Sequence, residues 1–239
     1  MFVRTLGACA VLAVAASAFA AAAETKPLRT LTFTINYSAV SSITSTMAGG
    51  LEVGSGFESH GFANDDKGTM RVDVIAATAD GGLVVDASFT GDKTRQIPVR
   101  IAILSDGRLA FDPKLNVAPE LIEFLPLLAR GLLADQAPAT GSTWTAPAPQ
   151  PLEGTRTYHV TTATDTSASL SITTDARVGG GQGYDRHEES SLVYDRKLSR
   201  PVRYDTRIRL RRRGLNGPET TDLHLTAALA GDTFGPLGS

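Results

Sequence analysis

The sequence predicts a mostly β protein: an antiparallel curved sheet, as a half-barrel, barrel or sandwich, with a short kinked helical insert. Apolar and polar residues alternate with period two along most of the chain, as in Leu31–Tyr37, which is the pattern of half-buried strands. Glycine-containing turns such as Asp80–Gly82 separate the alternating runs, which is typical of hairpins. One segment, 119–134, has helical spacing instead.

The first half of the chain reads as successive hairpins. Alternating runs at 70–76 and 83–89 flank the first clear turn, and a run at 97–103, whose inward residues are Ile97, Val99, Ile101 and Ile103, forms the next strand. Ser105–Arg108 turns the chain back toward Leu109. Residues 39–67 are the least readable because glycines, including Gly49, Gly50, Gly54 and Gly56, interrupt them, and two irregular strands could lie there.

The segment 119–134 predicts a buried helical insert. Pro119 suits a first helical turn, and Pro126 removes a backbone donor, so we expect a kink or two short helices. Apolar residues nearly encircle the segment, which favours burial against one face or mouth of the sheet. An apolar ligand held between this insert and the sheet would contact Leu121, Phe124, Leu125, Leu128 and Leu132.

Residues 137–154 contain four prolines and could be a linker between domains or an ordered loop with a strand around Trp144. Because the strands before and after look alike, we expect a single domain over 24–239. We expect Trp144 to anchor the core where the chain re-enters the sheet. Further strands are expected at 157–162, 167–175, 184–194, 202–213 and 221–229.

The N-terminal residues 1–23 read as a secretory signal peptide: Arg4, then a short apolar run, then small residues. The run is too short to span a bilayer. Cys9 resembles a lipidation site but precedes the apolar run, so we expect ordinary cleavage after Ala20 or Ala23. The protein is therefore expected to be exported, periplasmic or extracellular, without a transmembrane helix or a cysteine after signal removal.

Composition and motifs exclude several function classes. The net charge of −2 argues against nucleic acid as a partner. The chain lacks the common nucleophile, zinc-protease and phosphate-loop motifs, and its four histidines have no metal-ligand spacing, so no catalytic residue, metal or cofactor is expected. An outer-membrane barrel is disfavoured by the 6% aromatic content and the helical insert.

The run Val202–Arg213 predicts a strand with one apolar and one strongly basic face, because its odd positions are mostly arginine. Parity predicts its neighbours: Arg203 should face Val193, and Arg209 should face His187. The basic face would then carry a polar cluster of Asp185, His187, Glu189, Arg207, Arg209, Arg211, Asp222 and His224.

This cluster has two interpretations. Its members form cross-strand ion pairs on a solvated face, which we favour because three acids nearly neutralise the central arginines. Alternatively, uncompensated charge at Arg207, Arg209 and Arg211, with His187 and His224, binds an anion such as phosphate or an acidic polymer. Acid–base catalysis by either histidine is a third and weaker hypothesis.

The motifs Phe124-Leu125-Pro126 and Gly141-Ser142-Thr143-Trp144 give the chain a family likeness. It resembles uncharacterised bacterial secreted β-sheet families in which a helical insert precedes a G-D-x-W motif, with Ser142 replacing the acidic residue. The layout is also similar to half-barrel carriers of lipids and lipoproteins of the LolA or LppX type. Because an apolar helix is expected beside an antiparallel sheet and no catalytic motif is present, we expect a non-enzymatic protein that binds an apolar or amphiphilic, lipid-like ligand between the two. Binding of an anionic envelope polymer by the basic strand is the alternative.

Overall fold

The computed structural model describes residues 26–45, 57–112, 114–129, 138–148, 152–178, 183–214 and 217–234. The expected signal peptide and Cys9 lie outside these ranges. The described strands are β1 (Arg29–Ser45), β2 (Phe57–Ala77), β3 (Leu83–Gly91), β4 (Arg95–Ile103), β5 (Leu109–Ala110), β6 (Thr143–Pro147), β7 (Leu152–Ala163), β8 (Ser167–Val178), β9 (Asp185–Asp195), β10 (Arg200–Gly214) and β11 (Gly217–Asp232).

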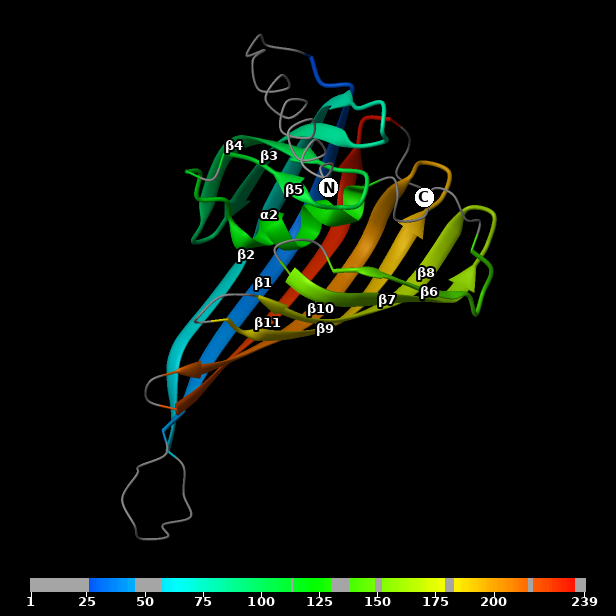
Figure 1. The fold of residues 1–239 in the computed structure, drawn as a ribbon. Coiled ribbons are helices and arrows are strands. Elements are labelled where there is room, and N and C mark those ends of the chain that lie inside the picture. The colour runs from blue at the N-terminus through cyan, green and yellow to red at the C-terminus, as the bar shows by residue number, and fades with distance from the viewer. Residues whose placement is uncertain are drawn as a thin grey trace, which may run out of the picture.

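These strands form one open, curved antiparallel sheet in the order β5-β4-β3-β2-β1-β11-β10-β9-β8-β7-β6 (Figure 1). The predicted fold class is confirmed. Each half of the chain is a meander of hairpins, and the halves join where β1 pairs with β11, from Leu31 opposite Asp232 to Ile43 opposite Glu219. The first and last strands therefore lie side by side in the middle of the sheet.

A cluster of ion pairs stabilises one end of the pairing between β1 and β11. Arg29 on β1 donates to Asp232 on β11 at 2.6 Å and to the Leu198 carbonyl at 2.9 Å. Arg200 on β10 also pairs with Asp232. The Asp232 side chain is fully buried, so the two arginines supply the charge that its carboxylate needs away from water. The cluster ties three neighbouring strands together.

The core lies on the concave face. Alternate residues of each strand point there, as period-two patterning requires. On β1 these are Leu31, Phe33, Ile35, Tyr37 and Ala39, all buried. They form one cluster with buried residues of the other strands, including Met70, Val72, Phe89, Ile101, Val160, Leu170, Ile172, Leu192, Tyr194 and Leu225.

The helical segment lies in the hollow of the sheet. It consists of α2 (Pro119–Phe124) and the 3-10 helix η1 (Leu125–Leu128), so the expected break near Pro126 is present as a change of helix type. The described helix ends at Leu128, because Ala129 is extended, and the rest of the predicted insert lies outside the described residues.

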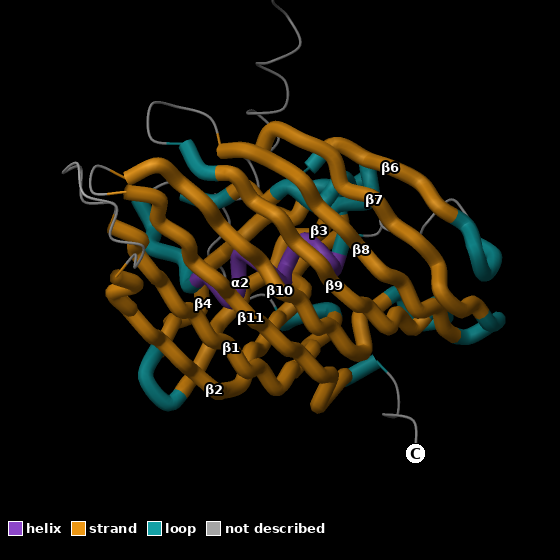
Figure 2. The backbone as a smooth tube through the Cα atoms, turned by 90° about the horizontal axis from the view of Figure 1, so that it is seen from below, coloured by secondary structure: helices purple, strands orange, loops and turns teal. Residues whose placement is uncertain are grey.

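The contacts of the helical segment show that the sheet is strongly curved. Its residues contact β3 and β4 on one side and β10 on the other. β4 and β10 are five strand spacings apart, about 24 Å along a sheet. A ten-residue segment reaches both because the sheet curls around it, and Figure 2 shows the helices behind the central strands.

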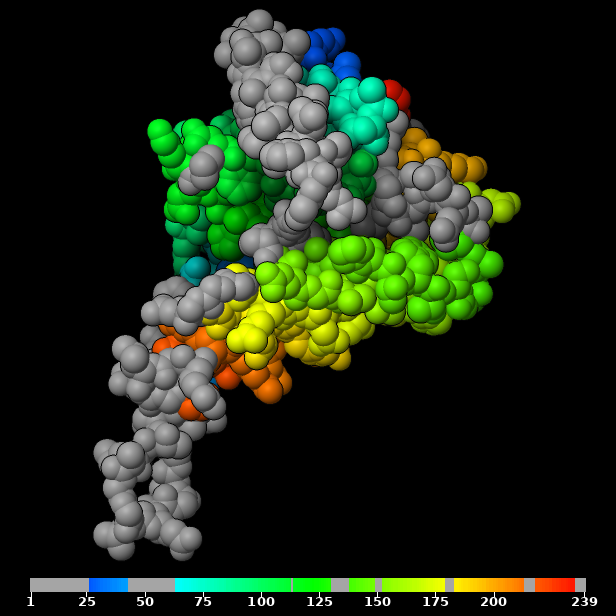
Figure 3. Space-filling model, in the orientation of Figure 1, coloured from blue at the N-terminus to red at the C-terminus, as the bar shows by residue number. Residues whose placement is uncertain are grey.

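The described residues of the poorly readable stretch 39–67 belong to two long strands, and the pairing of these strands has a register shift between Ser41 and Ser42, so the expectation of two irregular strands holds for the described part. β1 continues to Ser45 and β2 begins at Phe57. With β10 and β11 they extend beyond the rest of the sheet (Figure 1), and in the space-filling view the orange atoms of β10 and β11 lie lowest among the coloured atoms (Figure 3). Val40 follows buried Ala39, so it faces the convex side and is 41% exposed.

The sequence predicted that Ile97 faces the core, but this prediction is wrong, because its side chain is 69% exposed. Between β3 and β4 the register shifts: Ala87 pairs with Val99, but Phe89 pairs with Gln96. The extra residue on β4 is a β-bulge, which reverses the face of the residues beyond it. Val99, Ile101 and Ile103 remain buried as predicted.

Strands from both sides of the proline-rich stretch 137–154 belong to the same sheet. Trp144 on the edge strand β6 stacks on Tyr158 of β7, with ring centroids 5.0 Å apart and planes 8° from parallel, and packs against the core. The anchoring role predicted for it is confirmed. Within the described ranges, no helix is long and apolar enough to cross a bilayer.

Candidate functional site

The apolar part of the candidate site is the contact between the helical segment and the concave face. Leu121, Phe124, Leu125 and Leu128 are at most 4% exposed, and Leu132 lies outside the described residues. The Phe124 ring lies 4.5 Å from the ring of Phe33 on β1. It also meets Tyr204 on β10 edge-on, with centroids 6.3 Å apart. The structure therefore brings four of the five predicted ligand-contacting residues together, packed onto the sheet.

Next to this apolar contact lies a buried polar cluster that the sequence analysis did not identify. Arg156 on β7, Arg186 and Glu188 on β9, and Glu123 on α2 are its charged members. The side chains of both arginines and of Glu188 are at most 9% exposed. We call these four residues the hollow ion cluster. Its hydrogen-bonding neighbours are Thr174, Ser190 and Tyr204.

Arg186 is the centre of the hollow ion cluster. Its Nη1 and Nη2 donate to the two carboxylate oxygens of Glu123 at 2.9 and 2.7 Å, and Nη2 also donates to Glu188 at 3.0 Å. Arg156 donates to Glu188 at 3.2 Å and to the Thr174 hydroxyl at 3.0 Å. Such forked, charge-assisted bonds are the strong ones in proteins.

The ionisation of Glu188 follows from these partners. Burial alone would raise its pKa, but the positive charges of Arg156 and Arg186 and their hydrogen bonds outweigh burial and lower the pKa to about 2. The guanidinium of Arg186 has a raised pKa because its bonds to Glu123 and Glu188 outweigh the opposing effect of burial. Glu188 and Arg186 are therefore both charged at neutral pH.

Two further titratable groups lie under the helix. Glu120 of α2 is 1% exposed, and its Oε2 has no hydrogen-bond partner among the described residues. Burial raises the pKa of this carboxyl. Burial, reinforced by the charges of Glu120 and Glu123, also raises the pKa of Tyr37 to about 12. The α2 segment thus brings two carboxyl groups, those of Glu120 and Glu123, into the hollow.

On the convex face, the predicted basic strand has the predicted register. Arg203 pairs with Val193 and Arg209 with His187, and Arg207 lies opposite both Glu189 and His224. The residues of the polar cluster share this face, and several form the ion pairs that we favoured. These are Arg209–Asp222 at 2.7 Å, His224–Asp205 at 3.0 Å and His187–Asp175 at 2.7 Å.

Two arginines of the predicted anion site remain without an ion pair in the described part of the chain, Arg207 and Arg211. A shallow depression of about 530 Å³ is lined by Arg211 and its neighbours. Acids line it as well, so its charge is mixed. Its lining includes Glu153, Asp175, Arg177, Asp185, His187 and Arg209.

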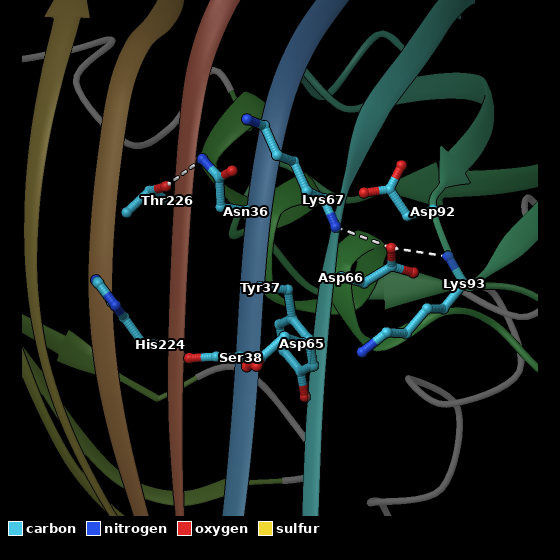
Figure 4. A pocket seen from close by; sticks show the side chains of 10 residues that line it. All are labelled: Asn36, Tyr37, Ser38, Asp65, Asp66, Lys67, Asp92, Lys93, His224 and Thr226. Carbon is cyan, nitrogen blue, oxygen red and sulfur yellow. Dashed lines mark hydrogen bonds between the residues drawn. The ribbon is translucent and has the colours of Figure 1, made fainter.

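A second convex depression, of about 430 Å³, lies over β1, β2 and β11 (Figure 4). Its most buried group, Asp66, accepts bonds from the backbone N–H groups of Lys67, Lys93 and Thr94 at 2.8–3.1 Å. Burial would raise the pKa of Asp66, but these bonds and one from the Thr94 side chain outweigh it and lower the pKa. Asp66 therefore holds the β3–β4 turn, which is a structural role.

Across the described ranges, no three His, Cys, Asp or Glu side chains gather as a metal site would require.

His187 offers a measurable test of the convex face. Its bond to Asp175, with Glu189 at 3.5 Å as a second partner, raises its pKa above the ordinary 6.5. Because the folded pKa exceeds the unfolded one, this contact stabilises the fold fully below pH 6.5, and its contribution disappears as the pH rises through the folded pKa. NMR titration should show the raised midpoint, and Asp175→Asn should lower it. Asp205→Asn, which removes the partner of His224, should leave it unchanged; a midpoint insensitive to Asp175→Asn would contradict the pairing.

No family model matches the chain, and no curated protein matches it in sequence. Among solved structures, one described as lipid–protein interactions in lipovitellin is similar to it, with a TM-score of 0.52 and 11% sequence identity. The match covers 90% of this chain and 26% of the lipovitellin chain, so this chain spans about a quarter of that protein. At this identity the likeness shows a shared fold. It agrees with the half-barrel layout expected from the sequence.

Proposed function

We propose that this protein binds an apolar or amphiphilic, lipid-like ligand in the hollow of its curved sheet. The observation that carries the proposal is the concave face itself: its buried apolar side chains form one large cluster, and among the described residues the ten residues of α2 and η1 pack onto it. The similarity to lipovitellin, a protein described by its lipid interactions, supports the same ligand class. We also propose that the chain is exported, on the basis of its N-terminal apolar run.

The ligand would replace the contacts of the helical segment. α2 has six residues and no side-chain cap at its N-terminus, so it is too short to be stable by itself. Its stability comes from packing Leu121 and Phe124 onto the sheet. An alkyl chain offers the sheet the same kind of contact, because hydrophobic burial is non-directional. If the ligand displaced the helical segment, the hollow would open. The hydrogen bonds lost from the side chains of α2 would be those between Glu123 and Arg186.

Trp144 provides a localised test, since it is the single tryptophan of the chain and packs against the core. A neutral ligand, the methyl ester of a dibrominated stearate, is titrated into the full chain while Trp144 fluorescence is followed. We expect saturable quenching, whereas bromide ion at equal concentration quenches little. Hydrogen exchange of the α2 amides should increase as the ester binds. A folded protein that shows no saturable quenching would refute lipid-like binding.

A second candidate function is binding of an anionic polymer by the convex arginines, favoured by the lack of ion-pair partners for Arg207 and Arg211 in the described chain. Retention on a dextran sulfate column should be salt-sensitive and should be lost in Arg207→Glu/Arg211→Glu. Arg108→Glu, on the β4–β5 turn, is the control. Equal retention of all three proteins would exclude this function.

A further inference from the structure

The sheet alone leaves a positive charge in the hollow. The charged sheet residues of the hollow ion cluster are Arg156, Arg186 and Glu188, whose formal charges sum to +1. Neutrality is reached only through Glu123, which belongs to the helical cover and not to the sheet. Since an unpaired buried charge is strongly unfavourable, a ligand that replaces the cover and keeps water away from Arg186 should supply another anion in place of Glu123.

The bonds around the cluster show which partner is exchangeable. Glu188 keeps sheet-borne donors without Arg186: Arg156 at 3.2 Å, Ser190 at 2.9 Å and Tyr204 at 3.3 Å. Arg186, by contrast, turns the ends of both Nη groups toward the helical carboxylate, with side-chain exposures of 9% and 17% for the two partners. Its Nε is buried with no partner in the described structure, so a donor remains for a third oxygen.

The hollow is also polarised along the strands. On β9 the inward residues run from Arg186 and Glu188 through Ser190 to Leu192 and Tyr194. On neighbouring β8 the buried residues also change from polar to apolar, from Thr174 to Ile172 and Leu170. From Arg186 to Tyr194 the strand spans about 27 Å. A charged group and an adjoining apolar floor on one concave surface match the two parts of an amphiphile.

We propose that Arg186, supported by Arg156, is the headgroup site for an anionic amphiphile, and that Glu123 occupies this site in the ligand-free chain. The inference rests on the proposed function and names its substrate class: an alkyl chain ending in a carboxylate or a phosphate. The ligand oxygens take the two Nη donors that Glu123 vacates, while the chain takes the apolar contacts that the helical segment vacates.

The test compares ligands with the same chain and different ends: oleate, its neutral methyl ester, and oleoyl lysophosphatidate. Affinities are measured by calorimetry on the full chain. We expect oleate to bind about tenfold more tightly than the ester, the factor that one charge-assisted hydrogen-bond pair supports. The tighter of oleate and lysophosphatidate identifies whether the natural headgroup is a carboxylate or a phosphate.

Three variants assign the effect to the cluster. Glu123→Gln removes the competing carboxylate, so oleate affinity should rise about tenfold while ester affinity changes little. Glu123→Gln/Arg186→Gln removes the pair together, which avoids a lone buried charge, and should abolish the preference for oleate over the ester. Asp185→Asn, which changes the exposed neighbour of Arg186 on the convex face, is the matched control and should behave as wild type.

Each outcome separates the two proposals. Equal binding of oleate and ester in every variant, with no gain for lysophosphatidate in Glu123→Gln, would overturn the headgroup site while leaving lipid-like binding intact. A Glu123→Gln variant that strengthens both ligands equally would show that Glu123 only holds the helix down, which also overturns the site. Absence of binding of all three ligands by every protein would overturn the proposed function itself. If lysophosphatidate alone gains from Glu123→Gln, the site stands with phosphate as its anion.

Discussion

Glu188→Gln should lower the free energy of unfolding by about 3–5 kcal/mol, the cost of leaving a buried charge without its partner. In the folded protein this carboxylate neutralises Arg156 and shares Arg186 with Glu123. The neutral amide retains the size of the side chain, so the change isolates the charge. Urea denaturation at pH 7 measures the effect.

The adjacent Glu189 is the matched control. It lies on the convex face with a 73% exposed side chain, and Glu189→Gln should change stability by less than about 0.5 kcal/mol. Equal effects of the two substitutions would show that the hollow ion cluster is not formed in solution.

The same carboxylate gives stability a defined pH dependence. The folded pKa of Glu188, about 2, lies below its ordinary value of 4.5. Its contribution is therefore complete above pH 4.5 and is lost as the pH falls toward 2. Between these values the wild-type protein should lose stability more steeply than Glu188→Gln.

Phe124→Ala should destabilise the protein by about 3–5 kcal/mol, as expected for a fully buried aromatic ring. The ring is 0% exposed and lies between Phe33 of β1 and Tyr204 of β10, so its removal leaves a void in the middle of the hollow. Thermal and urea unfolding monitored by circular dichroism measure the loss.

Ile122→Ala on the same helix supplies the comparison, because Ile122 is 41% exposed. Its cost should stay below about 1 kcal/mol. Two small and similar values would mean that the helical segment does not pack onto the sheet in solution, and that the hollow is open without a ligand.

The sequence predicted the basic strand and its neighbours in detail. Parity alone was enough, because a period-two strand with one buried face cannot slip by one residue without inverting every side chain. Arg203 opposite Val193, and His224 on the same face as Arg207, follow from that rule. The ion pairs on this face were predictable for the same reason.

The hollow ion cluster was missed although part of its signal was present. The same parity that placed His187 outward places Arg186 and Glu188 inward. Two charged residues on the face of a strand that points to the core indicate a buried network of ion pairs and hydrogen bonds. Their partner Glu123 could not be found by parity, because it comes from a helix 63 positions earlier whose docking no strand register determines.

The outward orientation of Ile97 also could not be predicted from the alternation of apolar and polar residues. The bulge that turns it depends on how β4 pairs with β3, which is a tertiary property. For 39–67 the sequence allowed two irregular strands, and the described residues on either side of 46–56 are the ends of β1 and β2. The bounds of these strands could not be predicted, because glycines interrupt the alternation that marks a strand.

The pairing of β1 with β11 has a consequence for how the chain reaches its fold. Every other strand pair in the sheet joins neighbours in sequence, but this one joins residues such as Arg29 and Asp232, 203 positions apart. Hairpins of each meander can form early and locally, whereas closure of the middle must wait for the last strand. Until then β1 and β11 each present a long unpaired backbone edge, the kind of surface that recruits other chains. The step most exposed to aggregation is therefore the final one, at the centre of the sheet.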